Sequence, residues 1–118
     1  MNLLPLTPDT EGILDRKLFC KLPQDACVVN VGRGAHLVEE DLLDAIRSGH
    51  LAGARLDVFR QEPLPADHPF WGEARISITS HISAETVKED SLAQIVEKIR
   101  MLEEGRPILG MIERSRGY

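Results

Sequence analysis

Short apolar segments alternate along the chain with segments whose apolar residues recur at helical spacing. Residues 26–31 (Ala-Cys-Val-Val-Asn-Val) form a nearly continuous apolar run, which is typical of a strand buried on both faces of a parallel sheet. Residues 52–59 and 75–79 predict two further strands, the second because polar and apolar positions alternate. Residues 60–72, with prolines at 63, 65 and 69, predict a loop.

Two helices are predicted in the first quarter of the chain. Thr7 followed by Pro8 is a helix-start signal, because proline fits the first helical turn. A second, short helix is expected over residues 15–22, with Asp15 as its N-cap and Pro23 after its end.

Two more helices are predicted further along. One begins at Glu39, where an acidic first turn favours the helix dipole, and stops at Gly49. The last begins near Thr86, which forms a capping-box pattern with Glu89, and ends at residues 105–107. Its apolar residues follow helical spacing and predict a face packed on the core: Leu92, Ile95, Val96, Ile99 and Leu102. Strands that alternate with helices predict an α/β architecture with a mostly parallel sheet.

Composition narrows the class of protein. With 118 residues, 42% apolar and 28% charged, the chain is expected to form one compact globular domain. The net charge of −5 argues against nucleic acid as a partner. No apolar run approaches the roughly 18 residues of a membrane span, and the N-terminus has no signal-peptide pattern. Cys20 and Cys27 lie outside any CxxC spacing, so we expect reduced thiols and a cytoplasmic location. No spacing among the histidines suggests a metal site.

Arg33 is the first candidate for chemistry. It lies between Gly32 and Gly34 at the end of the strand predicted over 26–31. Ligands of parallel sheets bind at the carboxyl ends of strands, and a guanidinium matches a carboxylate in a bidentate manner. Glycine on either side permits close approach of a ligand and unusual backbone angles. The alternative is a surface arginine in a tight turn.

Three more candidates follow strand ends or a proline-rich loop. His81 comes after the last predicted strand, and imidazole is the usual general acid or base near neutral pH. Glu62 lies among prolines, and a carboxylate beside an imidazole orients the ring and favours its protonated form. Asp57 could accept a hydrogen bond from a ligand amide. The alternatives are a structural or exposed histidine, a solvated glutamate, and an aspartate that ties down the following turn.

Five segments in a fixed order resemble a known family. The sequence resembles the NAD(P)-dependent D-2-hydroxyacid dehydrogenases over essentially its whole length, and its ending, residues 113–118, resembles their glyoxylate/hydroxypyruvate reductase branch. The segments that carry the resemblance are Leu4–Thr10, Val29–Gly34, Leu56–Phe59, Glu62–Pro65 and Thr79–Ser83.

The resemblance implies roles for the candidates. Arg33 would bind the carboxylate of the substrate, while His81, paired with Glu62, would give a proton to the carbonyl oxygen as hydride arrives from NAD(P)H. The positions implied to contact the cofactor are Thr7, Val31, Gly32, Arg33, Asp57, His81 and Ser83. Ser80 departs from the family, which usually has proline there, and this would loosen the approach to His81.

The glycine fingerprint GxGxxG of dinucleotide-binding domains is absent, because residues 32–37 carry leucine in place of the third glycine. We therefore expect residues 1–85 to form the C-terminal half of an NAD(P)-binding domain, with a partial Rossmann-type parallel sheet and flanking helices. Residues 86–118 are expected to form a C-terminal amphipathic helix and a tail returning toward the substrate lobe. On this interpretation the 118 residues alone would show negligible turnover, because the phosphate-binding half is missing.

The expected function is that of part of an oxidoreductase that reduces a small 2-keto acid, of glyoxylate or hydroxypyruvate type, to the 2-hydroxy acid with NAD(P)H. The alternative is a truncated, non-catalytic remnant that acts as an oligomerising or interaction module. Half of a parallel sheet leaves an open edge and apolar faces that need cover. We therefore expect the isolated chain to be a homo-oligomer or to be marginally stable.

Overall fold

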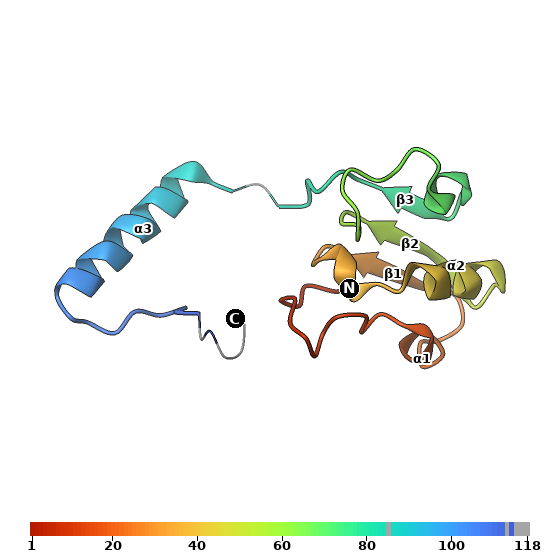
Figure 1. The fold of residues 1–118 in the computed structure, drawn as a ribbon, viewed down its shortest axis with the longest axis horizontal. Helices are drawn as coiled ribbons and strands as arrows, with labels where there is room; N and C mark the ends of the chain where they lie inside the picture. Colours follow the sequence, from red (N-terminus) through yellow and green to blue (C-terminus); the bar gives the residue numbers. More distant parts are fainter. Residues whose placement is uncertain (85, 113, 115–118) are drawn as a thin grey trace. The chain divides into compact units, whose positions relative to one another are not determined.

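A three-stranded parallel sheet forms the centre of the first of two compact units. The computed structural model describes residues 1–84, 86–112 and 114, and divides the chain into the units Met1–Ser83 and Ala84–Tyr118. The strands β1 (Ala26–Asn30), β2 (Leu51–Leu56) and β3 (Ile76–Ile78) lie in the order β1-β2-β3 (Figure 1). The predicted parallel α/β architecture and the presence of three strands are confirmed, but β2 ends at Leu56 and not at the predicted residue 59.

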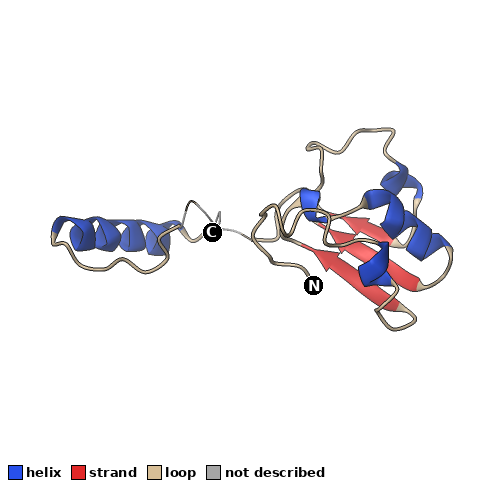
Figure 2. Ribbon diagram, turned by 60° about the horizontal axis from the view of Figure 1, so that its bottom comes forward, coloured by secondary structure: helices blue, strands red, loops and turns tan. Residues whose placement is uncertain are grey.

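One face of the sheet carries the core of the first unit. Val28 pairs with Ala54, which pairs with Ile76, and all three side chains are buried. The helices α1 (Arg16–Phe19) and α2 (Glu39–Arg47) pack on this face, as Figure 2 shows. Their largest contributions to the core are Phe19, Leu42 and Ile46, each at most 1% exposed. Burial of such side chains is the main source of stability in a unit of this size.

The opposite face of the sheet is not buried within this unit, and here the sequence-based prediction was wrong. Cys27 and Arg55 are exposed on that face, and Arg55 Nη1 donates a hydrogen bond of 2.7 Å to Ser77 Oγ across β2 and β3. The physical reason is that α1 and α2 both lie on one side (Figure 2). The apolar side chains of β1 that point to this face are therefore not buried within the first unit.

The predicted helix at Thr7 is a turn instead. Thr7 O accepts hydrogen bonds from the backbone N–H groups of Thr10 (3.1 Å) and Glu11 (3.0 Å), and Gly12 then takes a left-handed φ of +66°. A residue with left-handed backbone angles cannot continue an α-helix, so the chain forms a single turn and no helix follows. The interpretation of Thr7 and Pro8 as the start of a helix was therefore wrong.

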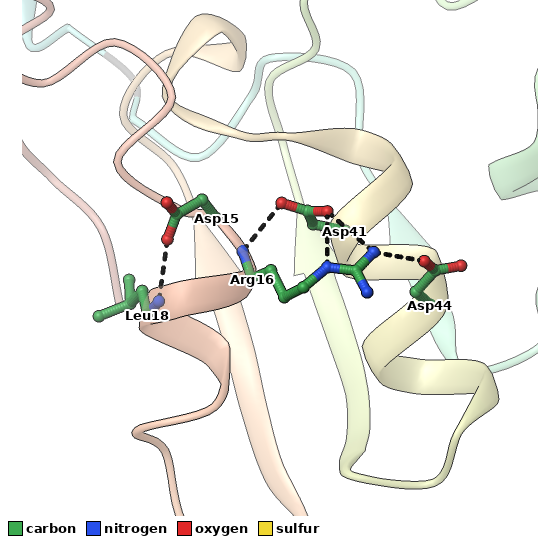
Figure 3. A network of polar contacts seen from close by, with 5 residues as sticks. All are labelled: Asp15, Arg16, Leu18, Asp41 and Asp44. Carbon is green, nitrogen blue, oxygen red and sulfur yellow. Dashed lines mark hydrogen bonds and ion pairs between the residues drawn. The ribbon is translucent and has the colours of Figure 1, made fainter.

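The helix α1 is shorter than the predicted 15–22 but begins where expected. Asp15 caps it, because one carboxylate oxygen accepts a hydrogen bond of 2.9 Å from the N–H of Leu18 (Figure 3). Arg16 joins α1 to α2: its backbone N–H donates to Asp41, and its guanidinium forms ion pairs with Asp41 and Asp44 (Figure 3). These pairs are solvent-exposed, so they fix orientation more than they add stability.

The helix α2 begins at Glu39, as predicted. It ends at Arg47, and Gly49 follows with φ +78°. Left-handed glycine just after the last turn is the usual stop of a helix. Leu42, Leu43 and Ile46 form its buried stripe, as the periodicity predicts.

The second unit contains α3 (Lys88–Glu103), which confirms the last predicted helix and its end at Gly105. Its N-cap is Val87, without a side-chain hydrogen bond, so the predicted capping box of Thr86 and Glu89 is wrong. The predicted burial of its apolar stripe is also wrong: Leu92, Ile95, Val96, Ile99 and Leu102 are 47–69% exposed. Within the described part of this unit α3 is the one regular element, so no other helix or strand of the unit covers the stripe.

Among the described residues, no helix has the length and apolar character needed to cross a membrane. Most of the C-terminal segment that resembles the reductase branch, Glu113 and residues 115–118, lies outside the described residues, as does Glu85.

Candidate active site

The carboxyl ends of the three strands bring most of the candidate residues to one edge of the sheet. Arg33 follows β1, Asp57 directly follows β2, and Thr79 to His81 follow β3. Because the strands are parallel and adjacent, these residues share an edge, with Asp57 in the middle position. Main-chain bonds link the ends: Asp57 N donates to Asn30 O (3.0 Å), and His81 N donates to Asp57 O (2.8 Å).

His81 and Glu62 form a direct pair. His81 Nδ1 lies 3.0 Å from Glu62 Oε2, and Glu62 Oε1 accepts a hydrogen bond of 2.9 Å from the N–H of Phe59. The hydrogen bond from His81, together with that of Phe59, holds the pKa of Glu62 below its usual value, against the opposing effect of burial. Glu62 is therefore ionised at neutral pH and fixes the hydrogen of the ring on Nδ1. Nε2 is left to exchange a proton with a ligand.

A shallow pocket of about 160 Å³ opens beside this pair. Its walls are largely apolar and include Phe59, Leu64, Ile78 and the exposed Trp71, whose indole N–H is fixed by a 2.8 Å bond to Pro65 O. The histidine side chain is 53% exposed, so its ring is accessible from solvent. An accessible titratable group on an apolar wall is the usual setting of a general acid.

Asp57 holds the loop that carries His81. Its carboxylate accepts hydrogen bonds from Thr79 Oγ1 and from the backbone N–H groups of Ile82 (2.9 Å) and Ser83 (3.0 Å). Burial raises the pKa of Asp57, but these three donors outweigh it and hold the pKa far below the usual range. His81 itself has a left-handed φ of 54°, which the bonds to Asp57 on either side support. The carboxylate thus ties down the turn after the strand, and three of its roughly four acceptor positions are used internally.

Arg33 lies on the same edge but does not line the pocket of His81. Its side chain is exposed, and Nη1 donates to Gly32 O at 2.7 Å. No carboxylate among residues 1–84, 86–112 and 114 forms an ion pair with it. Strands β1 and β3 are separated by β2, which places their ends on the order of 10 Å apart. The remaining donors of Arg33 are therefore available to an anion lying across the end of β2.

The glycines beside Arg33 serve the packing of the protein. A Cβ on Gly34 would lie 1.8 Å from the carbonyl carbon of Phe59, and one on Gly32 would lie 2.8 Å from Asn2 Nδ2. Neither glycine has a left-handed φ. The sequence-based interpretation was that these glycines give a ligand room and permit unusual backbone angles. It was wrong on the side where a Cβ would project, because that space is filled by Phe59, Asn2 and His36.

The other positions implied to contact a cofactor lie at different places. Val31 is half-buried directly before Gly32, and Ser83 follows the His81 turn, where its N–H is engaged by Asp57. Thr7 lies in the turn 7–12 and bonds to Thr10, with a backbone N–H to hydroxyl distance of 2.8 Å. Within the part of the chain that the structure describes, no hydrogen bond joins Thr7 to the other candidates.

Sequence reasoning missed the polar groups that support the edge. Thr79 donates to Asp57, while Asn2, Asn30 and His36 form a buried network under the turn of Arg33. A signal was present for Asn30, because an amide inside an apolar strand needs partners when it is buried. No spacing in the sequence pointed to Asn2 or His36.

The edge fits one end of a dinucleotide better than the other. The apolar pocket beside His81 suits an aromatic ring such as nicotinamide, and Asp57 keeps one acceptor position. A pyrophosphate prefers a helix start rich in free N–H groups. The helix α2 begins with Glu39, Glu40 and Asp41, whose charges repel phosphate. Within the described residues of the first unit we therefore find a fit for the nicotinamide end and none for the pyrophosphate.

Sequence comparison defines the class to which this parallel sheet and its edge belong. The sequence model "D-isomer specific 2-hydroxyacid dehydrogenase, NAD binding domain" matches residues 1–83. The chain belongs to this family of oxidoreductases, which confirms the resemblance, and it carries sequence of an NAD-binding domain.

Particular relatives narrow the class further. The chain is 49% identical over all 118 residues to glyoxylate/hydroxypyruvate reductase A of Yersinia enterocolitica and 47% identical to that of Klebsiella pneumoniae. In both cases it spans 38% of the relative's length.

Solved structures show the same fold. A D-isomer specific 2-hydroxyacid dehydrogenase from Xanthobacter autotrophicus, in complex with NADPH and MES, superposes with a TM-score of 0.92 at 41% identity, over 98% of this chain and 48% of that one. An NADPH-dependent glyoxylate/hydroxypyruvate reductase from Sinorhizobium meliloti, in complex with NADP and sulfate, gives 0.90 at 39% identity, over 98% and 38%. The partial Rossmann-type fold expected from the sequence is thereby confirmed.

Proposed function

We propose that this chain supplies the proton-donating and carboxylate-binding residues of an oxidoreductase that reduces a small 2-keto acid, of glyoxylate or hydroxypyruvate type, with NAD(P)H. The observation that carries the proposal is the His81–Glu62 pair, 3.0 Å apart, at the carboxyl edge of a parallel sheet. Relatives named as glyoxylate/hydroxypyruvate reductase A support the substrate class. Relatives solved with NADPH and NADP support the cofactor.

Arg33 is proposed to hold the carboxylate of the substrate. A 2-keto acid is an anion, and it needs a cation whose donors are not already consumed by the protein. Arg33 is exposed, and it lies about two strand spacings from His81 on the same edge. That span leaves room for a molecule of a few heavy atoms between the two side chains.

His81 is proposed to deliver the proton. When bound, the nicotinamide supplies hydride, which is the chemistry of the cofactor itself. The alkoxide oxygen that develops needs an acid, and the imidazolium held by Glu62 can give its proton from Nε2. Asp57 keeps His81 in place through the N–H groups on the turn, so we propose a positioning role for it beside the cofactor contact implied by the family resemblance.

We further propose a division of the chain, a set of cofactor contacts, a location and an oligomeric state. Residues 1–85 are proposed as the C-terminal half of the cofactor domain and residues 86–118 as the final helix and tail. Thr7, Val31, Gly32 and Ser83 are proposed as cofactor contacts by resemblance. The cytoplasmic location and the homo-oligomer stay predictions. The comparisons favour the enzyme over the non-catalytic interaction module.

A chimera tests the proposal. The matching segment of the Yersinia enterocolitica reductase is replaced by this chain, and oxidation of NADPH and NADH is followed with glyoxylate and hydroxypyruvate. We expect turnover of the chimera, and negligible turnover of the 118 residues alone, because they contain no glycine fingerprint. In the chimera, Arg33→Gln should raise KM for glyoxylate about a hundredfold, as expected for loss of a charge-assisted bidentate contact. A chimera that folds and binds NADPH but reduces neither acid would contradict the proposal.

A further inference from the structure

A buried polar network lies directly under the turn of Arg33. It consists of Asn2, Asn30 and His36, which are 6%, 0% and 0% exposed. Every buried side-chain nitrogen and oxygen among the described residues has at least one hydrogen-bond partner, so no polar atom of the network is left without one. A buried network of this kind favours one geometry, because an alternative would leave a polar group without a partner.

The partners of the His36 ring define its tautomer. Nδ1 lies 2.8 Å from Asn2 Nδ2 and 3.2 Å from the backbone nitrogen of Arg33. Both groups are donors, so Nδ1 accepts and carries no hydrogen. Nε2 lies 3.3 Å from Pro5 O, which only accepts, so the hydrogen is on Nε2. The ring is therefore neutral, in the Nε2–H form.

The orientation of the Asn2 amide is fixed independently. Asn2 Oδ1 accepts a hydrogen bond of 3.2 Å from the N–H of Leu4, and Asn2 Nδ2 donates to Asn30 Oδ1 at 2.9 Å. A flipped amide would place its NH₂ against the Leu4 N–H and its oxygen against Asn30 Oδ1. Two bonds would be lost, so Nδ2 faces His36.

The backbone N–H and the backbone carbonyl of Arg33 both form hydrogen bonds with members of this network. The N–H of Arg33 donates to His36 Nδ1, and the carbonyl of Arg33 accepts from Asn30 Nδ2 at 3.2 Å. His36 takes the place that Glu or Gln has in a capping box, reaching back three residues to a backbone N–H. The guanidinium, in contrast, is exposed.

We propose that His36 is a positioning residue for Arg33: its neutral ring, held between Asn2 and Pro5, fixes the backbone from which the guanidinium reaches the substrate carboxylate. The inference rests on the proposed function for the role of Arg33, but the geometry of the ring does not. Fixing the backbone in advance matters because a cation that is already aimed loses less conformational freedom when the anion binds.

The tautomer is the first test. ¹⁵N–¹H correlation spectra of the 118-residue chain at pH 7 separate a protonated from an unprotonated ring nitrogen. We expect His36 to show protonated Nε2 and unprotonated Nδ1. A ring protonated on Nδ1, or on both nitrogens, would overturn the inference, because Nδ1 could then not accept from Arg33.

Two substitutions of His36 give the second test. His36→Asn keeps an oxygen close to the Nδ1 position, whereas His36→Leu fills similar space without an acceptor. In the leucine variant we expect hydrogen exchange at the Arg33 amide to accelerate at least about tenfold, the effect of losing one buried hydrogen bond. The asparagine variant should stay within about threefold of wild type. His50→Leu is the matched control, because His50 Nε2 also contacts a backbone carbonyl, Phe19 O at 2.9 Å.

Binding of oxamate, a carboxylate that cannot be reduced, tests whether the backbone position of Arg33 affects how its guanidinium binds an anion. We expect its Kd, followed by shifts of the Arg33 signals, to rise about tenfold in His36→Leu and to stay near wild type in His36→Asn and His50→Leu. If the asparagine variant loses as much as the leucine variant, or neither loses anything, the inference is wrong. If the leucine variant does not fold, the tautomer and the asparagine variant still decide. If wild type binds no oxamate, the proposed role of Arg33 fails in this chain, while amide exchange still decides the role of His36.

Discussion

Asp57 and His81 are joined from both sides of the turn that presents the imidazole. The backbone N–H of His81 donates to Asp57 O at 2.8 Å, and the Asp57 carboxylate accepts from the N–H groups of Ile82 and Ser83. A histidine with φ 54° is thus held between two sets of bonds to a single buried residue. The orientation of His81, the proposed proton donor, therefore depends on Asp57, which need not touch the reacting atoms to matter.

Asp57→Asn is predicted to destabilise the chain. An amide cannot accept all three donors that meet the carboxylate, so we expect a loss of about 1–3 kcal/mol at pH 7, measured by urea unfolding. Asp67→Asn, an exposed position, is the control and should change stability by less than about 0.5 kcal/mol. Equal effects of the two substitutions would contradict the anchoring role.

The same carboxylate predicts how stability depends on pH. The pKa of Asp57 lies far below its ordinary 3.8 in the folded chain, so below about pH 4 the unfolded chain binds a proton that the folded chain does not. The stabilisation is therefore fully present above that pH and is lost as the pH falls. We expect the unfolding free energy of wild type to drop between pH 5 and pH 3 more steeply than that of Asp57→Asn. Parallel curves would count against the assignment.

Glu62→Gln is predicted to weaken the proposed proton donor, His81, without disturbing the loop. Glutamine still offers an oxygen to the N–H of Phe59, but it places no charge beside His81. In the chimera we expect turnover to fall about tenfold or more, because the amide places an NH₂ donor beside His81 Nδ1 and no longer holds the ring hydrogen on that atom. Glu11→Gln, which removes an exposed pair with Arg60, provides the control. A Glu62→Gln chimera that turns over as fast as the Glu11→Gln chimera would contradict the role of Glu62.

Gly34→Ala is predicted to be strongly destabilising although its φ is ordinary. A Cβ would lie 1.8 Å from the Phe59 carbonyl carbon and 2.3 Å from Arg60 N, so the ends of β1 and β2 would have to separate. We expect a loss of at least about 2 kcal/mol in chemical denaturation. Gly72→Ala, where a Cβ meets nothing within 4 Å, should be close to neutral. If the two variants unfold alike, the close approach is not part of the folded state.

The exposed stripe of α3 predicts self-association of the isolated chain. Ile95 and Ile99 are 53% and 51% exposed, and water-exposed apolar rows favour contact between copies. Sedimentation should show oligomers for wild type, and a shift toward monomer for the double substitution Ile95→Glu and Ile99→Glu. Ala93→Glu with Gln94→Glu adds the same charge to exposed positions outside the stripe and should leave the oligomers in place. A monomeric wild-type chain with cooperative unfolding would contradict this prediction.

The elements that sequence alone predicted are those whose signals are local. The valine-rich run predicted β1, and Asp15 predicted the cap of α1. The acidic first turn and Gly49 predicted the two ends of α2. Burial was predicted poorly, because exposure of the α3 stripe and of Cys27 depends on what lies opposite them in space. Periodicity states which face is apolar, but it does not state whether this chain covers that face.

The candidate site divides in the same manner. Arg33, Asp57 and His81 could be found because each follows a strand, and strand ends share an edge. Two of the residues that support this edge, Asn2 and His36, could not be found from the sequence. They are 34 residues apart, and their contact exists because the N-terminal segment runs beside β1. Long-range partners of this kind have no signature in a single sequence.

The most direct measurement is the rate of glyoxylate reduction by the chimera when His81, and separately His50, is replaced by glutamine. Glutamine cannot give up a proton, so the account predicts that His81→Gln lowers kcat at least about a hundredfold, with NADPH binding retained. His50→Gln should remain within about threefold of the parent chimera, because the ring of His50 contacts the backbone carbonyl of Phe19 and is not among the candidate site residues. A His81→Gln chimera that reduces glyoxylate as fast as the His50→Gln chimera would contradict the assignment of His81 as the proton donor.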